Sequence, residues 1–265
     1  MSVTHIKTRD ATVNLDAKSM KKLEDSQVES FDTEYVEDGR WDTVRARIDQ
    51  DFPSGDFTFL DVGGGNGKFA DCLLAQYPES TGTVLDNSEV LSARNQPNER
   101  KTVILDSVEN LGHIDTKFDI VCVHWLLHHL VSDSYIQTRQ NQLSTLKAVD
   151  ALLTARGRVS VFENVYSGWL IENLPGLIIY HLTSAKAIRA ITRRLGANTA
   201  GVGVCFLSKN QWYSTTRNAG LQILSYAEPD NWIWPLRPEW KVCLHIRRIC
   251  VGHFWLSTRK GEGLP

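Results

Sequence analysis

The 265-residue sequence lacks the features that mark several large classes of protein. It has no Cys-x-x-Cys pair and an odd number of cysteines, five, which argues against a disulfide framework or a zinc knuckle. No apolar run approaches the roughly 18 residues of a membrane span. The N-terminus also has no apolar core of a signal peptide. We therefore expect a cytoplasmic protein with reduced thiols and no integral membrane segment.

A large excess of one charge is also missing. The chain has 29 Lys and Arg against 31 Asp and Glu, a net charge of −2, which argues against a general nucleic-acid binder. Apolar residues make up 42%, enough for the core of one globular domain spanning 1–265. Residues 1–56 are polar and acidic, with helical patterns at 20–28 and 41–50, and we predict an N-terminal helical cap there.

From residue 57 onward, short apolar runs alternate with helical patterns. The predicted strands are 57–62, 82–86, 101–106, 118–123, 157–163, 221–227 and 248–257. The predicted helices of this part of the chain are 68–77, 132–155 and 208–219. Strands that alternate with helices predict βαβ units around a parallel sheet, and continuous apolar strands indicate a sheet buried on both faces.

The first predicted strand runs into a glycine-rich turn, Gly63-Gly-Gly-Asn-Gly67. Such a turn lets a cofactor approach the backbone, and the following helix offers unpaired N–H groups. The dinucleotide fingerprint fits only from Gly65, so the glycines alone leave a nicotinamide cofactor open. Asp61 would repel a pyrophosphate but can bind a cationic or hydroxylated ligand. Asp86 and Asp106 end the next two strands, where carboxylates can accept from ribose hydroxyls and from an adenine amino group.

These residues resemble the motifs of class I S-adenosylmethionine-dependent methyltransferases. The D-x-G-x-G-x-G motif of that superfamily stands as Asp61-Val-Gly-Gly-Gly-Asn-Gly67, with its two later acids at Asp86 and Asp106. The fourth-strand segment of small-molecule members stands as Phe118-Asp-Ile-Val-Cys-Val-His-Trp-Leu-Leu-His-His129. The resemblance implies a Rossmann-like, doubly wound α/β fold whose seven-stranded sheet ends in an antiparallel hairpin.

The resemblance also implies a cofactor, S-adenosylmethionine, and a role for each matching residue. The glycine loop would pass the amino-acid part of the cofactor, Asp86 would hold the ribose, and Asp106 the adenine. His124 or its backbone would flank the methionine end, and Tyr35, Arg40 and Trp41 would cover the carboxylate. The predicted cofactor-binding residues are Tyr35, Asp61, Gly63, Gly65, Asp86, Asn87, Asp106, Ser107 and His124.

Candidate catalytic residues follow the fourth and fifth predicted strands. His128 and His129 are candidate bases, and Glu163 lies at the same edge of the sheet. The alternative is that the histidines pack a helix start, since a methyltransferase needs no base for every acceptor. His124 and His128 have the i, i+4 spacing of a metal pair, but no nearby Glu completes such a site, so no metal is expected. The candidate substrate-binding residues are Tyr166, Trp169 and Trp212.

An insertion at 165–207 interrupts the alternation of strands and helices. Most of it lies in a stretch from Asn173 to Ala227 that has no acidic residue and six basic ones. Lys186, Arg189 and Arg193 share one face of a predicted basic amphipathic helix. This helix could belong to a lid over an anionic substrate, rest on an anionic membrane surface, or be a solvated face.

The predicted function is methyl transfer to a small molecule, a natural-product or secondary-metabolite intermediate with an apolar body. Oxygen, nitrogen and carbon acceptors all remain open, and the chain is expected to be a monomer or a homodimer. Two alternatives belong to other classes. One is a methyltransferase-like protein, such as a cyclase or binding module, that binds the cofactor without transferring methyl. The other is a nicotinamide-dependent dehydrogenase.

Overall fold

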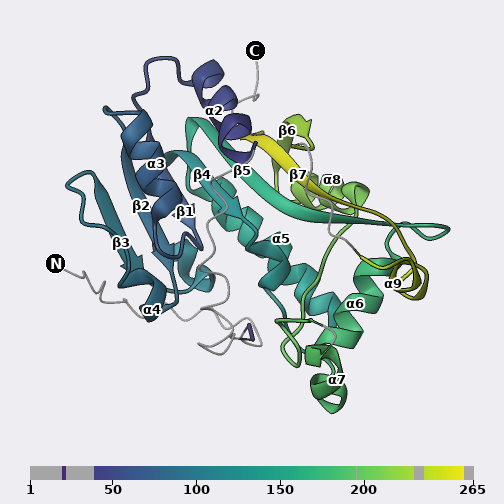
Figure 1. Cartoon of the computed structure of the whole chain (residues 1–265). Helices are drawn as coiled ribbons and strands as arrows, with labels where there is room; N and C mark the ends of the chain where they lie inside the picture. The colour runs from purple at the N-terminus through teal and green to yellow at the C-terminus, as the bar shows by residue number, and fades with distance from the viewer. Residues whose placement is uncertain (1–19, 22–38, 195, 230–235, 260–265) are drawn as a thin grey trace.

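The computed structural model describes residues 20–21, 39–194, 196–229 and 236–259 (Figure 1). Its centre is a seven-stranded sheet with the order β3-β2-β1-β4-β5-β7-β6. The strands are β1 (Thr58–Val62), β2 (Thr81–Asp86), β3 (Lys101–Leu105), β4 (Phe118–His124), β5 (Leu153–Gly168), β6 (Leu221–Ala227) and β7 (Ile246–Thr258). The first five strands are parallel, and β7 pairs antiparallel with both β5 and β6. The predicted doubly wound sheet with an antiparallel end is therefore confirmed.

Helices cover both faces of this sheet. The α-helices of the described residues are α2 (Arg40–Asp51), α3 (Lys68–Gln76), α4 (Glu89–Ser92), α5 (Tyr135–Ala151), α6 (Leu174–Ser184), α7 (Arg189–Arg194), α8 (Lys209–Asn218) and α9 (Pro238–Cys243). The 3₁₀ helices in the same part of the chain are η2 (Val108–His113), η3 (Leu127–His129) and η4 (Lys186–Ile188). The short α4, η2 and α9 have no counterpart among the helices expected from the sequence pattern.

The two-residue period of β4 divides the core between the two faces. Val121 and Val123 point into a cluster that includes α5 and α8, through residues such as Leu146. Ile120 and Cys122 point into the opposite cluster, which holds apolar residues of α2 and α3. Both sides of the strand are buried, as its unbroken apolar sequence predicts.

Side-chain caps fix where the long helices begin. Ser134 accepts a hydrogen bond from the backbone of Gln137 at the start of α5, and Ser208 forms a capping box with Gln211 at the start of α8. Helix α5 is shorter than the 132–155 expected, because Ser134 begins it and Leu153 already belongs to β5.

Strands β5 and β7 are much longer than their neighbours. β5 continues five residues past the predicted end at Glu163, to Gly168, and pairs with β7 along its length. The pairs beyond Glu163, residues 164–168 and 246–251, form an arm that reaches past the rest of the sheet (Figure 1). The first residues of the predicted insertion are thus part of a strand.

The insertion is helical from Leu174 to Ser184 and from Lys186 to Arg194, but it does not form one basic helix. The segment from Lys186 is a 3₁₀ turn followed by the six-residue α7, and Gly196 follows with a φ of +90°. Of the helix expected at 20–28, only residues 20 and 21 are described, and Lys21 donates its amide to the carbonyl of Val131. No helix in the described ranges combines the length and apolarity needed to cross a membrane.

Candidate functional site

The carboxyl ends of the parallel strands meet at one edge of the sheet. Strands β1 and β4 are neighbours there, and the chain leaves them toward opposite sides, which makes a topological switch point. Ligands of open α/β sheets bind at such a point. The candidate residues from five strands therefore converge at one edge, although they span about a hundred positions in the sequence.

The glycine loop between β1 and α3 is held in a conformation that favours glycine. Gly63, Gly65 and Gly67 have φ values of +71°, +54° and +74°. A Cβ on Gly67 would lie 1.8 Å from Oδ1 of Asn95, whose amide donates to the carbonyl of Gly65 at 2.9 Å. A Cβ on Gly64 would lie 2.6 Å from Oδ2 of Asp61. The loop thus has no room for side chains where the predicted cofactor would run.

Two buried aspartates lie beneath this loop. Burial raises the pKa of Asp61 to about 7, with Arg40 lowering it and Asp86 raising it. Burial also raises the pKa of Asp86, against the hydrogen bonds that lower it. The amide of Gly65 donates to one oxygen of Asp86 at 3.0 Å, and the amide of Ser88 donates to the other at 2.8 Å. Asp86 therefore fixes the loop as well as ending its strand.

The third acid follows β3. Oδ1 of Asp106 accepts the amide of Ser107 at 2.7 Å and the side-chain amide of Asn110 at 2.6 Å. Ser107 caps η2, and Asn87, after β2, is exposed. Three carboxylates on adjacent strand ends suit an ammonium or sulfonium group, a ribose diol and an adenine amino group, all of which S-adenosylmethionine carries. These three carboxylates therefore fit the groups of that cofactor.

A chain of hydrogen bonds runs from α2 into the sheet. Nη2 of Arg40 lies 2.7 Å from Nδ1 of His124, whose Nε2 lies 2.9 Å from Oγ of Ser160. The same hydroxyl lies 3.0 Å from Nε2 of the fully buried His253. Because an arginine only donates, Nδ1 of His124 accepts, and the Nε2–H of His124 then donates to Ser160. Burial, followed by the nearby Arg40, keeps the pKa of His124 well below its usual range, so it stays neutral.

The same arginine lies among aromatic rings. Its guanidinium carbon is 4.6 Å from the ring centre of Phe69 and 4.9 Å from that of Trp125. Arg40, which the resemblance places at the cofactor carboxylate, thus reaches the switch point and lowers the pKa of Asp61. Of the other two residues expected there, Tyr35 lies outside the described residues, and Trp41 has its ring centre 6.2 Å from that of Phe69. Sequence reasoning missed Ser160 and His253, although each is a polar residue within an apolar strand.

Glu163 and His128 form a buried pair at the adjacent strand end. Oε2 of Glu163, which is completely buried, lies 2.7 Å from Nδ1 of His128. Its other oxygen accepts the backbone amide of Leu127 at 2.8 Å. A carboxylate beside Nδ1 holds the proton on that nitrogen and leaves Nε2 of His128 as the acceptor. The pair therefore both anchors η3 and sets the histidine tautomer.

His129 differs from its neighbour. Burial, with a further contribution from His128, holds the pKa of His129 well below its usual range. Its ring centre is 4.0 Å from that of His128. The insertion also reaches this point: the ring of Phe206 lies 5.0 Å from that of His128 and stacks on Tyr166 at 4.4 Å. Tyr166 is thereby connected, through Phe206, to the catalytic candidates.

The two candidate tryptophans lie elsewhere. Trp212 on α8 is completely buried in the main core and packs against Phe254. Trp169 follows the arm and is 58% exposed. Trp212 is therefore a core residue, and Trp169 lies at the end of the arm. In the described ranges, no three His, Cys, Asp or Glu side chains are grouped as a metal site would require.

Comparison with known proteins finds a family model that matches part of the chain and solved structures with a similar fold. Residues 60–161 match the family model of the methyltransferase domain. A SAM-dependent methyltransferase from Leishmania major superposes with a TM-score of 0.54 at 14% identity, covering 82% of this chain and 70% of that one. No curated protein sequence matches the chain.

Two natural-product enzymes are also similar in structure. CalO1, a methyltransferase in calicheamicin biosynthesis, in its SAH-bound form, superposes at TM-score 0.50 and 16% identity, covering 82% of this chain and 55% of that one. The mitomycin 7-O-methyltransferase MmcR also gives 0.50, at 15% identity, covering 77% and 50%. The chain spans about half the length of these two proteins. Residues 60–161 therefore resemble a methyltransferase domain, and the sheet order and structural neighbours give the chain the class I methyltransferase fold.

Proposed function

We propose that the protein transfers the methyl group of S-adenosylmethionine to a small-molecule acceptor with an apolar body, a natural-product or secondary-metabolite intermediate. The observation that carries the proposal is the Glu163–His128 pair. In this pair the carboxylate fixes the tautomer of a histidine base at the carboxyl edge of a sheet with the methyltransferase fold. The similarity to CalO1 and to the mitomycin 7-O-methyltransferase supports this acceptor class, because both enzymes belong to natural-product chemistry.

The cofactor supplies an electrophilic methyl group on a sulfonium. In this proposal Asp86 binds the ribose, Asp106 the adenine, and the loop at Gly63 and Gly65 accommodates the amino-acid part. Asp61 contributes a carboxyl group beside the loop, and Arg40 faces the carboxylate. Ser160 and His253 act behind Arg40 by fixing the ring of His124.

The chain's own contribution to transfer is orientation and proton removal. Nε2 of His128 removes a proton from the substrate that receives the methyl group, while Glu163 keeps Nδ1 of the same ring protonated. His129, with its depressed pKa, is a poor proton acceptor and instead packs against His128. Tyr166 and Phe206 provide an apolar wall on the insertion side. We propose that residues 165–207 and the N-terminal segment together cover the acceptor.

The experiment is a calorimetric titration with S-adenosylhomocysteine, with NADH as the parallel ligand. We expect S-adenosylhomocysteine alone to bind. Binding of NADH alone would favour the dehydrogenase and remove the proposal. A second step supplies labelled S-adenosylmethionine with a panel of apolar phenols, carboxylic acids and amines. Tight cofactor binding with no labelled product across the panel would favour the alternative of a binding module or cyclase.

A further inference from the structure

Exposed apolar side chains gather at the end of the β5–β7 arm. Trp169, Leu170 and Ile171 in the turn after β5 are 58%, 92% and 59% exposed, and Trp240 and Val242 on α9 are 38% and 72% exposed. We call these five residues the apolar tip. Single exposed apolar residues are ordinary, but a contiguous group of this size marks a surface that meets another apolar phase.

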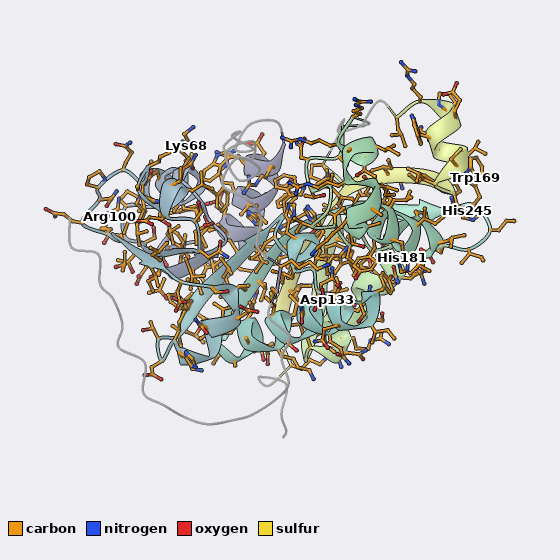
Figure 2. All side chains as sticks on the ribbon, turned by 90° about the horizontal axis from the view of Figure 1, so that it is seen from below. Lys68, Arg100, Asp133, Trp169, His181 and His245 are labelled. Atoms are coloured by element: carbon orange, nitrogen blue, oxygen red, sulfur yellow. The ribbon has the colours of Figure 1, made fainter. Side chains whose placement is uncertain are left out.

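The apolar tip is one unit because His245 joins its two halves. Nε2 of His245 accepts the backbone amides of Leu170 at 3.0 Å and Ile171 at 3.2 Å. The amide of His245 itself donates to the carbonyl of Val242 on α9 at 3.0 Å. Figure 2 shows Trp169 and His245 together at one end of the molecule. The turn and α9 therefore present their apolar side chains on a common, fixed support.

Apolar packing beneath the tip makes the support rigid. Ile179 on α6, Val204 in the insertion and Ile246 on β7 form a small buried cluster. Leu244, which follows α9, packs against this cluster, so α6, the arm and α9 are connected. The exposed residues are consequently not left over from a loose segment but stand on a packed base.

Basic residues lie on the same elements as one half of this surface. Residues 236–249, which comprise α9 and the start of β7, contain four basic residues and one acidic residue, Glu239. The basic residues are Arg237, Lys241, Arg247 and Arg248. Arg237, Arg247 and Arg248 are exposed, and Arg248 is paired with Glu228. This part of the surface is therefore positively charged, although the chain as a whole has a net charge of −2.

The charge decides between possible partners. A second copy of the chain placed symmetrically on this surface would bring two positive regions together, which opposes association. An anionic lipid bilayer is complementary in both respects. Its acyl boundary accepts Trp, Leu and Ile side chains, and its headgroups attract Lys and Arg.

We propose that the apolar tip, with the basic residues of α9 and the start of β7, docks the protein on an anionic membrane surface. The indoles of Trp169 and Trp240 enter the headgroup–acyl boundary, and the exposed arginines contact anionic headgroups. Docking is peripheral and reversible. It does not depend on the proposed methyl transfer, because the tip lies beyond the strand ends that hold the cofactor residues.

The test is flotation of the full chain with vesicles of phosphatidylcholine alone or with one quarter phosphatidylglycerol. We expect binding to the mixed vesicles, at least tenfold weaker binding to the neutral ones, and loss of binding in high salt. Tryptophan emission should shift to shorter wavelength with the mixed vesicles. Absence of binding to the mixed vesicles, or equal binding to both kinds, overturns the proposal.

Matched variants locate the contact. Leu170→Ser with Ile171→Ser should weaken binding at least tenfold, whereas Ile136→Ser, at an exposed position on α5, should not change it. Arg247→Glu should weaken binding about fivefold to tenfold, and Lys147→Glu on α5 serves as its control.

Circular dichroism and S-adenosylhomocysteine affinity verify that each variant is folded. If the control variants lose as much binding as the tip variants, the assignment of the surface is wrong. If sedimentation instead shows a dimer that Leu170→Ser with Ile171→Ser dissociates, and vesicles do not bind, the partner is a second copy and the proposal fails.

Discussion

Buried aspartates lie at both ends of the parallel strands, and their pKa values are shifted in opposite directions. At the carboxyl end, burial raises the pKa of Asp61 and of Asp86. At the amino end, Asp119 on β4 is also buried, and burial alone would raise its pKa as well. Hydrogen bonds from Arg156, Thr58 and Thr154 outweigh that effect and lower it.

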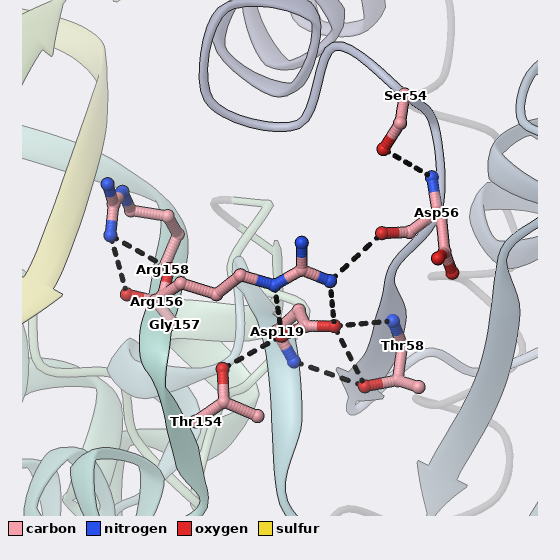
Figure 3. A network of polar contacts seen from close by, with 8 residues as sticks. All are labelled: Ser54, Asp56, Thr58, Asp119, Thr154, Arg156, Gly157 and Arg158. Atoms are coloured by element: carbon pink, nitrogen blue, oxygen red, sulfur yellow. Dashed lines mark hydrogen bonds and ion pairs between the residues drawn. The ribbon is translucent and has the colours of Figure 1, made fainter.

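Figure 3 shows how fully the amino-end carboxylate is satisfied. Arg156 donates to both oxygens of Asp119 at 2.9 Å, a bidentate pair. Thr154 adds a hydroxyl at 2.8 Å and the amide of Thr58 a bond at 3.1 Å. These bonds join β1, β4 and β5. The difference teaches that burial alone does not identify a ligand-binding carboxylate: Asp119 stabilises the fold, whereas Asp61 is held at a cost that a cationic ligand can offset.

The largest effect is expected at the carboxyl end of the strands, at the carboxylate that orients the proposed base. In Glu163→Gln, one oxygen still accepts the amide of Leu127, but the new amide donates to Nδ1 of His128 and moves the ring proton to Nε2. We expect kcat to fall about 10²-fold or more, with S-adenosylhomocysteine affinity within about twofold of wild type. His113→Gln, an exposed histidine on η2, is the control. A normal kcat in Glu163→Gln would leave the pair a purely structural role.

The next effect concerns the glycine loop. Gly67→Ala places a Cβ within 1.8 Å of Asn95 at a φ of +74°, so the loop must shift. We expect S-adenosylhomocysteine to bind about 100-fold more weakly, as measured by calorimetry. Gly112→Ala, where nothing lies within 4 Å, should bind normally. Unchanged affinity in Gly67→Ala would mean that the cofactor does not depend on this loop conformation.

A smaller effect is expected in how the free energy of unfolding depends on pH, and it distinguishes Asp61 from Asp119. Asp61 has a pKa of about 7 when folded and an ordinary value of 3.8. The folded state therefore binds the extra proton between these values, and the free energy of unfolding falls as pH rises from about 4 to about 7. Asp61→Asn should remove on the order of 2 kcal/mol of this loss between pH 5 and 7, as urea unfolding would show. Asp115→Asn, at an exposed position, should keep the wild-type dependence. A wild-type dependence in Asp61→Asn would contradict the raised pKa.

The smallest effect is expected at the amino end. Asp119→Asn weakens the bidentate contact with Arg156 and should lower the free energy of unfolding by about 1.5 kcal/mol at neutral pH. Because the lowered pKa of Asp119 stabilises the fold above the ordinary value, this deficit should shrink as pH falls below about 4. Neither kcat nor cofactor affinity should change. A selective loss of cofactor affinity would remove the distinction between the two ends of the strands.

The positions of the proposed cofactor residues at the strand ends could be predicted because their signals are local. The glycine turn, Asp86 and Asp106 each follow an apolar run, and the alternation of runs fixes the sheet. The same local pattern gave β6 its observed bounds, 221–227.

Long-range contacts could not be predicted in this way. The Arg40–His124–Ser160–His253 chain joins α2 to three strands, and no spacing in the sequence records such a contact. The burial of Trp212 and the exposure of Trp169 likewise depend on tertiary position, which the presence of an aromatic residue in the sequence does not reveal. The basic helix also breaks at Arg189, where a 3₁₀ turn precedes α7.

The length of β5 has a consequence for how this protein can change over evolution. One uninterrupted strand carries Arg156 at the amino-end network, Ser160 behind His124, Glu163 under His128, and Tyr166 in the arm. A single-residue insertion or deletion within it would turn every later side chain to the opposite face of the sheet. Changes in length are therefore tolerated only after Gly168, in the turn. The reach of the arm can diversify among descendants while the spacing inside β5 stays fixed.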